Sequence, residues 1–159
     1  MDKLKLKICV ILLIFISPYY SFPQVFNDIE WYDVDSLLLI LPPQQDEERL
    51  HTLNALAASL SFEDRAKCTQ YATEAMALAG DLDNERGLAA AKRSLGLMEF
   101  YAGNYPGALN YFQKAMDIYE QTDNYYLMAQ TLEDIAKVHY FANNIEKTFE
   151  VMFMARDIY

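Results

Sequence analysis

Few side chains in this sequence could do chemistry. Two histidines, His51 and His139, stand far apart, and neither has a nucleophile at a fixed spacing that would suit catalysis. The acidic run Asp46, Glu47 and Glu48 resembles a cation site. However, acids at the start of a helix are stabilised by its dipole, so this run predicts a helix start instead. Structural or solvent-facing roles are therefore expected for all five residues.

Metal and cofactor chemistry has no better support. Asp81 and Asp83 are expected to cap a helix rather than to ligate a cation. Cys9 falls in a segment expected to be removed, and one remaining thiol, Cys68, cannot form an internal disulfide or a zinc site. We expect Cys68 to be a small buried packing residue. The sequence also lacks a phosphate-binding glycine loop and a His-Glu-x-x-His motif. No catalytic residue, metal or cofactor is expected.

The composition favours a packed helical protein. Hydrophobic residues make up 53% of the 159 residues and charged residues 23%, and only five glycines and five prolines occur. Four of the prolines precede residue 44, so the rest of the chain is nearly free of helix breakers. The formal net charge of −10, with no basic stripe, repels phosphate backbones. Nucleic acid is therefore not an expected partner.

The first 24 residues predict an export signal. Three lysines within the first seven residues precede an apolar run at residues 8–16, and Pro18 follows. The run is about half the length needed to cross a hydrocarbon core of about 30 Å. We expect cleavage within residues 21–24, although no small-x-small triplet marks the position. The alternative is an uncleaved anchor, which would tie the protein to a membrane. The expected location is periplasmic or otherwise extracytoplasmic.

Residues 25–45 predict a lead-in segment. The apolar run at residues 37–41 ends at Pro42 and Pro43, which stop any helix there. We expect this segment to cover the apolar end of the array that follows, because terminal repeats need a cover. Trp31 is expected to take part in that contact, with ligand stacking as its alternative role.

From residue 46 onward the chain compares with itself at an offset of 40. The sequence AMDIY at residues 115–119 returns as ARDIY at residues 155–159, and Tyr71 returns as Tyr111. Apolar residues at spacings of three and four predict two helices in each window. Turn pairs such as Gly103-Asn104 separate them. We predict an all-α array of antiparallel helix pairs. The predicted helices span 46–60, 63–79, 84–102, 105–121, 125–142 and 144–159, grouped as repeats near 46–80, 84–121 and 125–159.

Small residues are expected to let the paired helices approach closely. Gly96 is predicted to face Ala108, and Ala136 to face Thr148. The positions predicted to pack the repeats together are Leu95, Gly96, Gly103, Tyr105, Ala108, Phe112, Ala115, Ala136 and Ala155.

These residues carry a resemblance. The resemblance is to the tetratricopeptide repeat signature, and it covers roughly residues 46–159. The residues that match the signature are Leu95, Gly96, Gly103, Tyr105, Ala108, Phe112 and Ala115. Glu99 stands where the family usually has an aromatic residue, and Glu120 replaces the closing proline. The period of 40 is similar to that of stretched repeats in exported or sensory bacterial proteins. The resemblance implies a right-handed superhelical solenoid with a concave groove, and a partner that is a protein or peptide.

In that family the first helix of each pair lines the groove. The resemblance places Leu50, Leu53 and Ala57 there in the first repeat. In the later repeats it places Arg93, Leu97, Phe100, Tyr101, Gln130, Glu133, Lys137 and Tyr140 there, with Ala90 and Phe141. The alternative for the aromatic residues among them is core or inter-repeat packing. The family's clamp for a terminal carboxylate is missing, because Leu53, Ala57, Leu97, Gln130 and Asp134 occupy its positions.

Three functions remain open. The first is a non-catalytic binding scaffold, and the second is the sensory front end of a signalling protein such as a histidine kinase, nucleotide cyclase or transcriptional regulator. The apolar outer face of the last helix, with Phe149, Met152 and Phe153, bears on this choice. This face is expected to be covered either by a continuing array or by self-association. If the chain is part of a longer signalling protein, a membrane span is expected downstream. An enzyme acting on polysaccharide is the third and weakest hypothesis.

Overall fold

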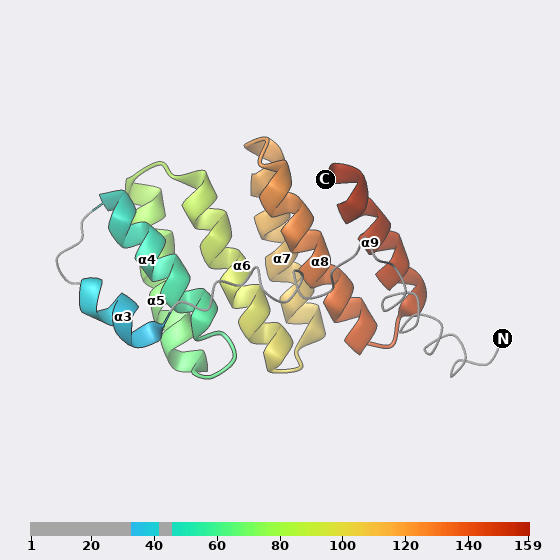
Figure 1. Ribbon diagram of the computed structural model, residues 1–159, viewed down its shortest axis with the longest axis horizontal. Helices are drawn as coiled ribbons and strands as arrows, with labels where there is room; N and C mark the ends of the chain where they lie inside the picture. Colours follow the sequence, from blue (N-terminus) through green and yellow to red (C-terminus); the bar gives the residue numbers. More distant parts are fainter. Residues whose placement is uncertain (1–32, 42–45) are drawn as a thin grey trace. The chain divides into compact units, whose positions relative to one another are not determined.

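The computed structural model describes residues 33–41 and 46–159, and all regular structure within them is helical. These ranges form seven helices, labelled in Figure 1: α3 (Val34–Ile40), α4 (Asp46–Ser59), α5 (Arg65–Asp81), α6 (Glu85–Tyr101), α7 (Tyr105–Gln121), α8 (Tyr125–Phe141) and α9 (Ile145–Ile158). From α4 onward they begin and end within two residues of the predicted ranges. The predicted export signal at residues 1–24, and Trp31, lie outside the described residues.

The helices from α5 to α8 are spaced evenly along the chain. Each has 17 residues, and the same interval separates the start of each helix from the start of the next. The even spacing comes from one turn used four times. In the turn after α6, Gly103 has a φ of 77° and donates its N–H to the Phe100 carbonyl, while Asn104 donates to the Glu99 carbonyl. This pair of bonds satisfies two carbonyls at the helix end, and glycine adopts the positive φ without strain.

The other three turns place Asp83, Asp123 and Asn143 at the positive-φ position. An asparagine follows each, and its side chain accepts a hydrogen bond from the backbone N–H three residues on, capping the next helix. The prediction that Asp83 caps a helix is therefore wrong. Asp83 supplies the turn, where short polar side chains tolerate a left-handed backbone, and Asn84 supplies the cap.

The pairs α4–α5, α6–α7 and α8–α9 stack in chain order (Figure 1). The first helices α4, α6 and α8 touch one another in succession, whereas within the described ranges α5, α7 and α9 do not touch. Instead, α5 packs against α6 and α7 packs against α8, the first helix of the next pair in each case. The predicted all-α architecture of stacked helix pairs, a helical-repeat solenoid, is confirmed.

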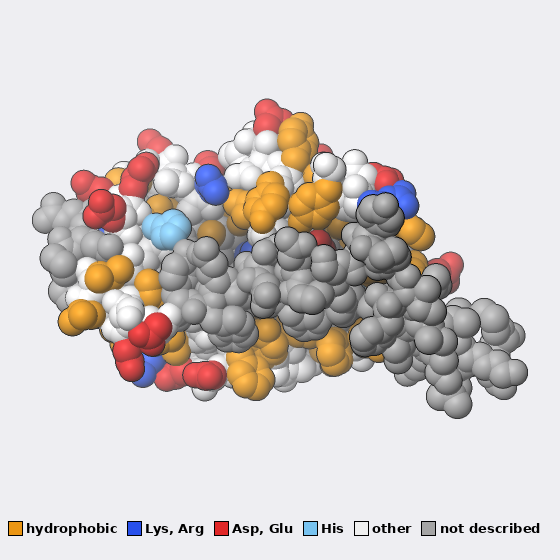
Figure 2. Space-filling model, viewed as in Figure 1, with side chains coloured by type: hydrophobic (Ala, Val, Ile, Leu, Met, Phe, Trp, Pro, Cys, Tyr) orange, Lys and Arg blue, Asp and Glu red, His pale blue; other side chains and the backbone are white. Residues whose placement is uncertain are grey.

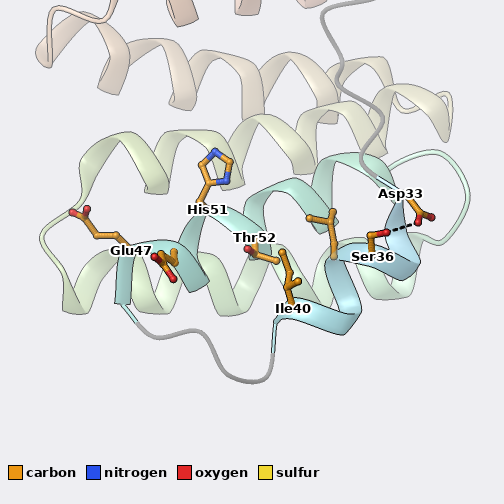
Figure 3. A pocket seen from close by; sticks show the side chains of 8 residues that line it. Asp33, Ser36, Ile40, Glu47, His51 and Thr52 are labelled. Carbon is orange, nitrogen blue, oxygen red and sulfur yellow. Dashed lines mark hydrogen bonds between the residues drawn. The ribbon is translucent and has the colours of Figure 1, made fainter.

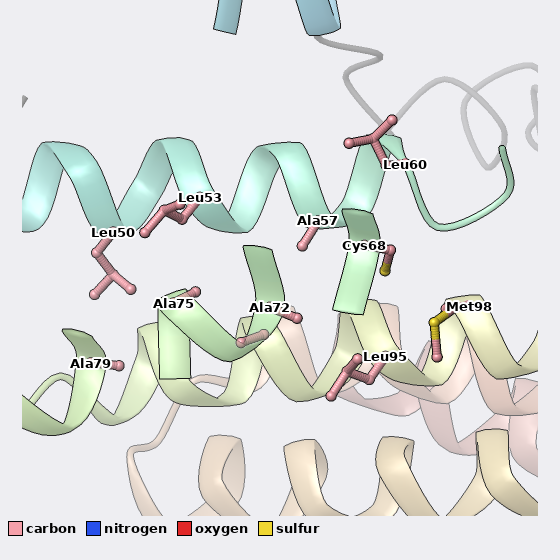
Figure 4. Close-up of a cluster of buried hydrophobic side chains, with 11 residues drawn as sticks. Leu50, Leu53, Ala57, Leu60, Cys68, Ala72, Ala75, Ala79, Leu95 and Met98 are labelled. Carbon is pink, nitrogen blue, oxygen red and sulfur yellow. The ribbon is translucent and has the colours of Figure 1, made fainter. Parts of the chain in front are cut away.

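Small side chains on α5 make the first part of the core compact (Figure 4). Cys68, Ala72, Ala75 and Ala79 are all buried, and leucines of α4 and the Leu95 side chain of α6 pack around them. Burial raises the pKa of the Cys68 thiol to about 12, so the thiol stays protonated and unreactive at neutral pH. Cys68 is therefore a packing residue, as its sequence context predicts.

In the second repeat, α6 and α7 approach closely at Gly96. A Cβ atom at this position would lie 2.6 Å from two carbons of the Phe112 ring. Phe112 thus lies on Gly96, because the large ring fills the space that the glycine leaves. The predicted contact between Gly96 and Ala108 stays a prediction. Of the residues predicted to pack the repeats, Tyr105 is half-buried and Gly103 is exposed in its turn. The others are buried, namely Leu95, Gly96, Ala108, Phe112, Ala115, Ala136 and Ala155.

The short helix α3 packs on the outer side of α4. Its Leu37 is 6% exposed and contacts Ala55 and Leu56. This contact covers apolar surface at the start of the array, where no earlier helix pair lies within the described residues.

Candidate partner-binding surface

The first helices present the surface on which we expected a partner to bind, but part of the predicted set is buried. Leu97 is 5% exposed and packs with Ile135 and Val138 of α8. Leu50, Leu53 and Ala57 of α4 are buried with α5 and α6. The prediction that these four residues face a partner is wrong. Because neighbouring first helices touch directly, an apolar side chain at their junction becomes core.

The charged residues of the predicted set belong to an internal network centred on Asp134. The Asp134 side chain is 1% exposed and lies between two cations. Arg93 donates from Nε to Asp134 Oδ2 at 2.7 Å, and Lys137 Nζ donates to Oδ1 at 2.9 Å. Arg93 Nη1 also donates to Gln130 Oε1 at 3.3 Å. The network joins α6 to α8 and engages both cations that the sequence predicts a ligand would meet.

Electrostatics agree with a structural role for this network. Burial lowers the pKa of the Arg93 guanidinium, but the charge and hydrogen bond of Asp134 outweigh it, so the pKa is raised. Burial raises the pKa of the Glu133 carboxyl, and Lys137 and a hydrogen bond to Tyr159 offset part of the effect. Arg93 and Lys137 therefore act first as partners of Asp134.

A second internal network explains the departure from the family pattern at Glu99. The Glu99 side chain is 11% exposed, and its Oε1 accepts a 2.7 Å hydrogen bond from Arg65 of α5. Its Oε2 accepts another from Asn104, the residue that caps α7. An acid at this position thus joins α5, the end of α6 and the turn into α7, in place of an aromatic contact.

The aromatic residues remain at the surface. We use the name aromatic edge for the rings at the ends of α6 and α8, in the α4–α5 turn and at the start of α7. These are Phe62, Phe100, Tyr101, Tyr105, Tyr140 and Phe141. Phe62 is 65% exposed and Phe141 60%, whereas Phe100 is half-buried at the centre. Figure 2 shows exposed hydrophobic side chains over the α8 region, while acidic side chains surround the end formed by α3 to α5.

The rings of the aromatic edge hold one another in place. Phe100 stands 5.2 Å from Tyr101 and 5.4 Å from Phe141, measured between ring centroids, and Phe62 meets Tyr101 edge to face at 5.2 Å. Such contacts orient the rings before any partner arrives. Phe100, Tyr101, Gly103, Tyr105 and Phe141 line a hollow of about 250 Å³. The arrangement can receive one or two apolar side chains of a protein segment.

Sequence reasoning missed two residues here. Phe62 lies in a turn, where periodicity gives no signal, and its ring partner Tyr101 belongs to the next repeat. From the sequence, Asp134 is recognisable only as one of the residues that occupy the positions of the missing carboxylate clamp. The sequence does contain a signal for Asp134. Asn54, Ser94 and Asp134 stand at the same position of the three repeats, each within an otherwise apolar helix stretch.

A second hollow lies between α3 and α4 and measures about 580 Å³ (Figure 3). Its lining combines the apolar Leu37 and Ile40 with polar residues, namely Asp33, Ser36, Glu47, Glu48, His51 and Thr52. The hydrogen bond from Ser36 lowers the pKa of Asp33, so this acid is ionised at neutral pH. Across the described residues, no group of three His, Cys, Asp or Glu side chains is placed to hold a metal ion.

No helix in the described part of the chain is both long enough and apolar enough to cross a membrane. Among known proteins, residues 87–150 match the family model described as tetratricopeptide repeat. These residues include α7 and α8, most of α6, and the start of α9. No curated protein and no solved structure matches the chain.

Proposed function

Because this chain is a tetratricopeptide-repeat protein, we propose that it is a non-catalytic scaffold that binds a protein or peptide at the aromatic edge. Tetratricopeptide repeats generally mediate protein–protein interaction. The supporting observation is that exposed, mutually oriented rings from two successive repeats surround one hollow. Rigid aromatic side chains give a large contact area for little loss of conformational entropy, and they dominate binding energy at many interfaces.

The charge distribution narrows the kind of segment that fits. Arg93 and Lys137 are paired with Asp134, so the first helices offer little charge to a ligand carboxylate. The rings of the edge offer apolar faces, and the tyrosines add hydroxyl groups at the rim. We therefore propose recognition of an apolar or aromatic segment, in place of the charge contacts that the sequence suggested.

The experiment compares capture of binding proteins by three forms of the chain. Tyr101→Ser combined with Phe141→Ser removes two exposed rings of the edge and leaves the buried core intact. Tyr125→Ser is the matched control, because Tyr125 is 55% exposed at the opposite end of α8. We expect the edge variant to lose its partners, with affinity reduced about tenfold or more, and the control to retain them.

Two outcomes would count against the proposal. If the edge variant keeps the partners of the native chain, the binding surface lies elsewhere. If the native chain captures no protein beyond what an empty resin retains, a scaffold function has no support. Circular dichroism of each variant checks that the helices are retained.

We also propose that the chain acts outside the cytoplasm. The support is the sequence pattern at residues 1–24, with lysines ahead of an apolar run. Mass spectrometry of the protein recovered from the cell envelope should show a chain that begins between residues 21 and 25. Recovery of the intact chain from the cytoplasm alone would contradict this location.

A further inference from the structure

The second helices carry equivalent positions that differ in exposure. Ala72 of α5, Phe112 of α7 and Met152 of α9 occupy the same place in successive repeats, and the first two are 0% exposed while Met152 is 46% exposed. In α5 and α7 the next first helix covers this position. The same face of α9 remains open to solvent.

The apolar surface of α9 is wider than a continuing array would require. Phe153 and Met154 are 53% and 49% exposed. At the equivalent positions, α5 and α7 carry polar residues that face solvent even though the next helix is present, namely Thr73, Glu74, Gln113 and Lys114. Covering by another first helix would therefore leave Phe153 and Met154 exposed. A different contact is needed to bury them.

Two rings of α9 lie side by side on this face, Phe149 half-buried and Phe153 exposed. Phe149 and Phe153 stack with their centroids 6.5 Å apart and their planes at 28°. Arg156 stands 5.0 Å from the centroid of the Phe153 ring and also donates hydrogen bonds to the exposed Asp157. Glu146 lies about two turns before Phe153, at the other end of the same stripe. The stripe thus has an acid at one end, two rings in the middle and a base at the other end.

The opposite end of a second copy does not complement this stripe. One face of α6 packs on α5, and the equivalent face of α4 carries Glu48 and His51. Leu37 of α3 packs near this face of α4. Head-to-tail stacking would place these polar residues and α3 against Phe149 and Phe153. Burying unpaired polar groups in this way is unfavourable.

We propose that α9 pairs antiparallel with α9 of a second copy, across a two-fold axis between Phe149 and Phe153. Antiparallel pairing about this centre sets Phe149 opposite Phe153 of the second copy. It also sets Glu146 opposite Arg156 of the second copy, and the symmetry produces each contact twice. The stripe is therefore complementary to itself in both charge and apolar surface. Aromatic pairs and opposite charges in register are the features that stabilise such helix pairs.

Sedimentation velocity of the full chain over a range of concentrations tests the pairing. The native chain is expected to form a dimer, and Arg156→Glu should raise the dissociation constant about tenfold or more, because it places two acids opposite each other. Lys147→Glu is the control. Lys147 lies two residues before Phe149, which places it on the other side of the helix, and its substitution should leave the dimer unchanged.

A charge-exchange variant tests which residues of the two α9 helices lie opposite each other. Glu146→Arg combined with Arg156→Glu exchanges the charges and is expected to restore the dimer to near its native dissociation constant. Failure of this pair to restore a dimer that Arg156→Glu has lost would overturn the two-fold arrangement. A native chain that stays monomeric at every concentration would overturn the proposal as a whole, whatever the result for the aromatic edge.

Discussion

The helices α7 and α9 hold the same position in successive repeats and have different neighbours. Phe112 of α7 is fully buried under α8, whereas its equivalent in α9, Met152, is half exposed. Both helices pack on the first helix of their own pair. The difference shows that the repeat that follows completes the core of the repeat before it, so equivalent positions can be buried or open.

The largest expected effect compares the two positions directly. Phe112→Ala should lower the free energy of unfolding by about 3–5 kcal/mol, because it opens a cavity beside Gly96. Met152→Ala should cost about 1 kcal/mol or less in the monomer, because much of that side chain is already in water. Urea unfolding at low protein concentration measures both. Equal losses would show that the two faces are equally covered.

The ion pairs of the two regions can be compared in the same way, one buried between α6 and α8 and one exposed on α9. Asp134→Asn should cost about 2–4 kcal/mol, since it leaves Arg93 and Lys137 without their acid, although both cations reach solvent in part. The Arg156–Asp157 pair on α9 is more than half exposed, so Asp157→Asn should change stability by at most about 0.5 kcal/mol. Thermal unfolding of the two variants would distinguish them. A small effect at Asp134 would mean that its network contributes little to joining α6 and α8.

The helix caps of α7 and α9 also differ, and their loss is expected to have smaller effects on stability. Asn104→Ala removes the cap of α7 and also a hydrogen bond to the buried Glu99, so we expect a loss of about 1.5–2 kcal/mol. Asn144→Ala removes only a cap, that of α9, and should cost about 1 kcal/mol or less. If chemical denaturation shows the opposite order, the Glu99 network does not stabilise the α7 end.

The smallest effect is a pH dependence at the end of the array. Burial raises the pKa of Glu133 above its ordinary value of 4.5, so the folded state holds this proton more tightly than the unfolded state does. The stability that Glu133 contributes is therefore present below pH 4.5 and lost as the pH rises above it. Relative to Glu133→Gln, the native chain should become less stable between about pH 4 and pH 7. A difference that stays constant over this range would show that Glu133 titrates normally.

The sequence predicted the helices well because each turn repeats the same chemistry. A residue suited to positive φ followed by asparagine recurs at a constant interval from Asp83 to Asn144, and this spacing places the helix ends. The remaining error at Asp83 arose because an aspartate can fill either position of that turn, and only the backbone shows which one it takes.

The binding surface was predicted less well. Repeat spacing shows which residues lie on the first helices, but not how closely those helices approach. The sequence could not reveal that Leu97 would be buried between α6 and α8, or that Asp134 would pair with Arg93 from the neighbouring repeat. Surface rings such as Tyr101 and Tyr140 were found because their size and position are independent of those distances.

Hydrogen–deuterium exchange of α7 and α9 at low and high protein concentration tests the central comparison most directly. At low concentration, amides of α9 should exchange faster than those of α7, because among the described helices α9 packs only on α8. At high concentration, exchange in α9 should slow while α7 stays unchanged, as pairing covers the open face. Exchange in α9 that is as slow as in α7 at low concentration, or that does not respond to concentration, would contradict the account.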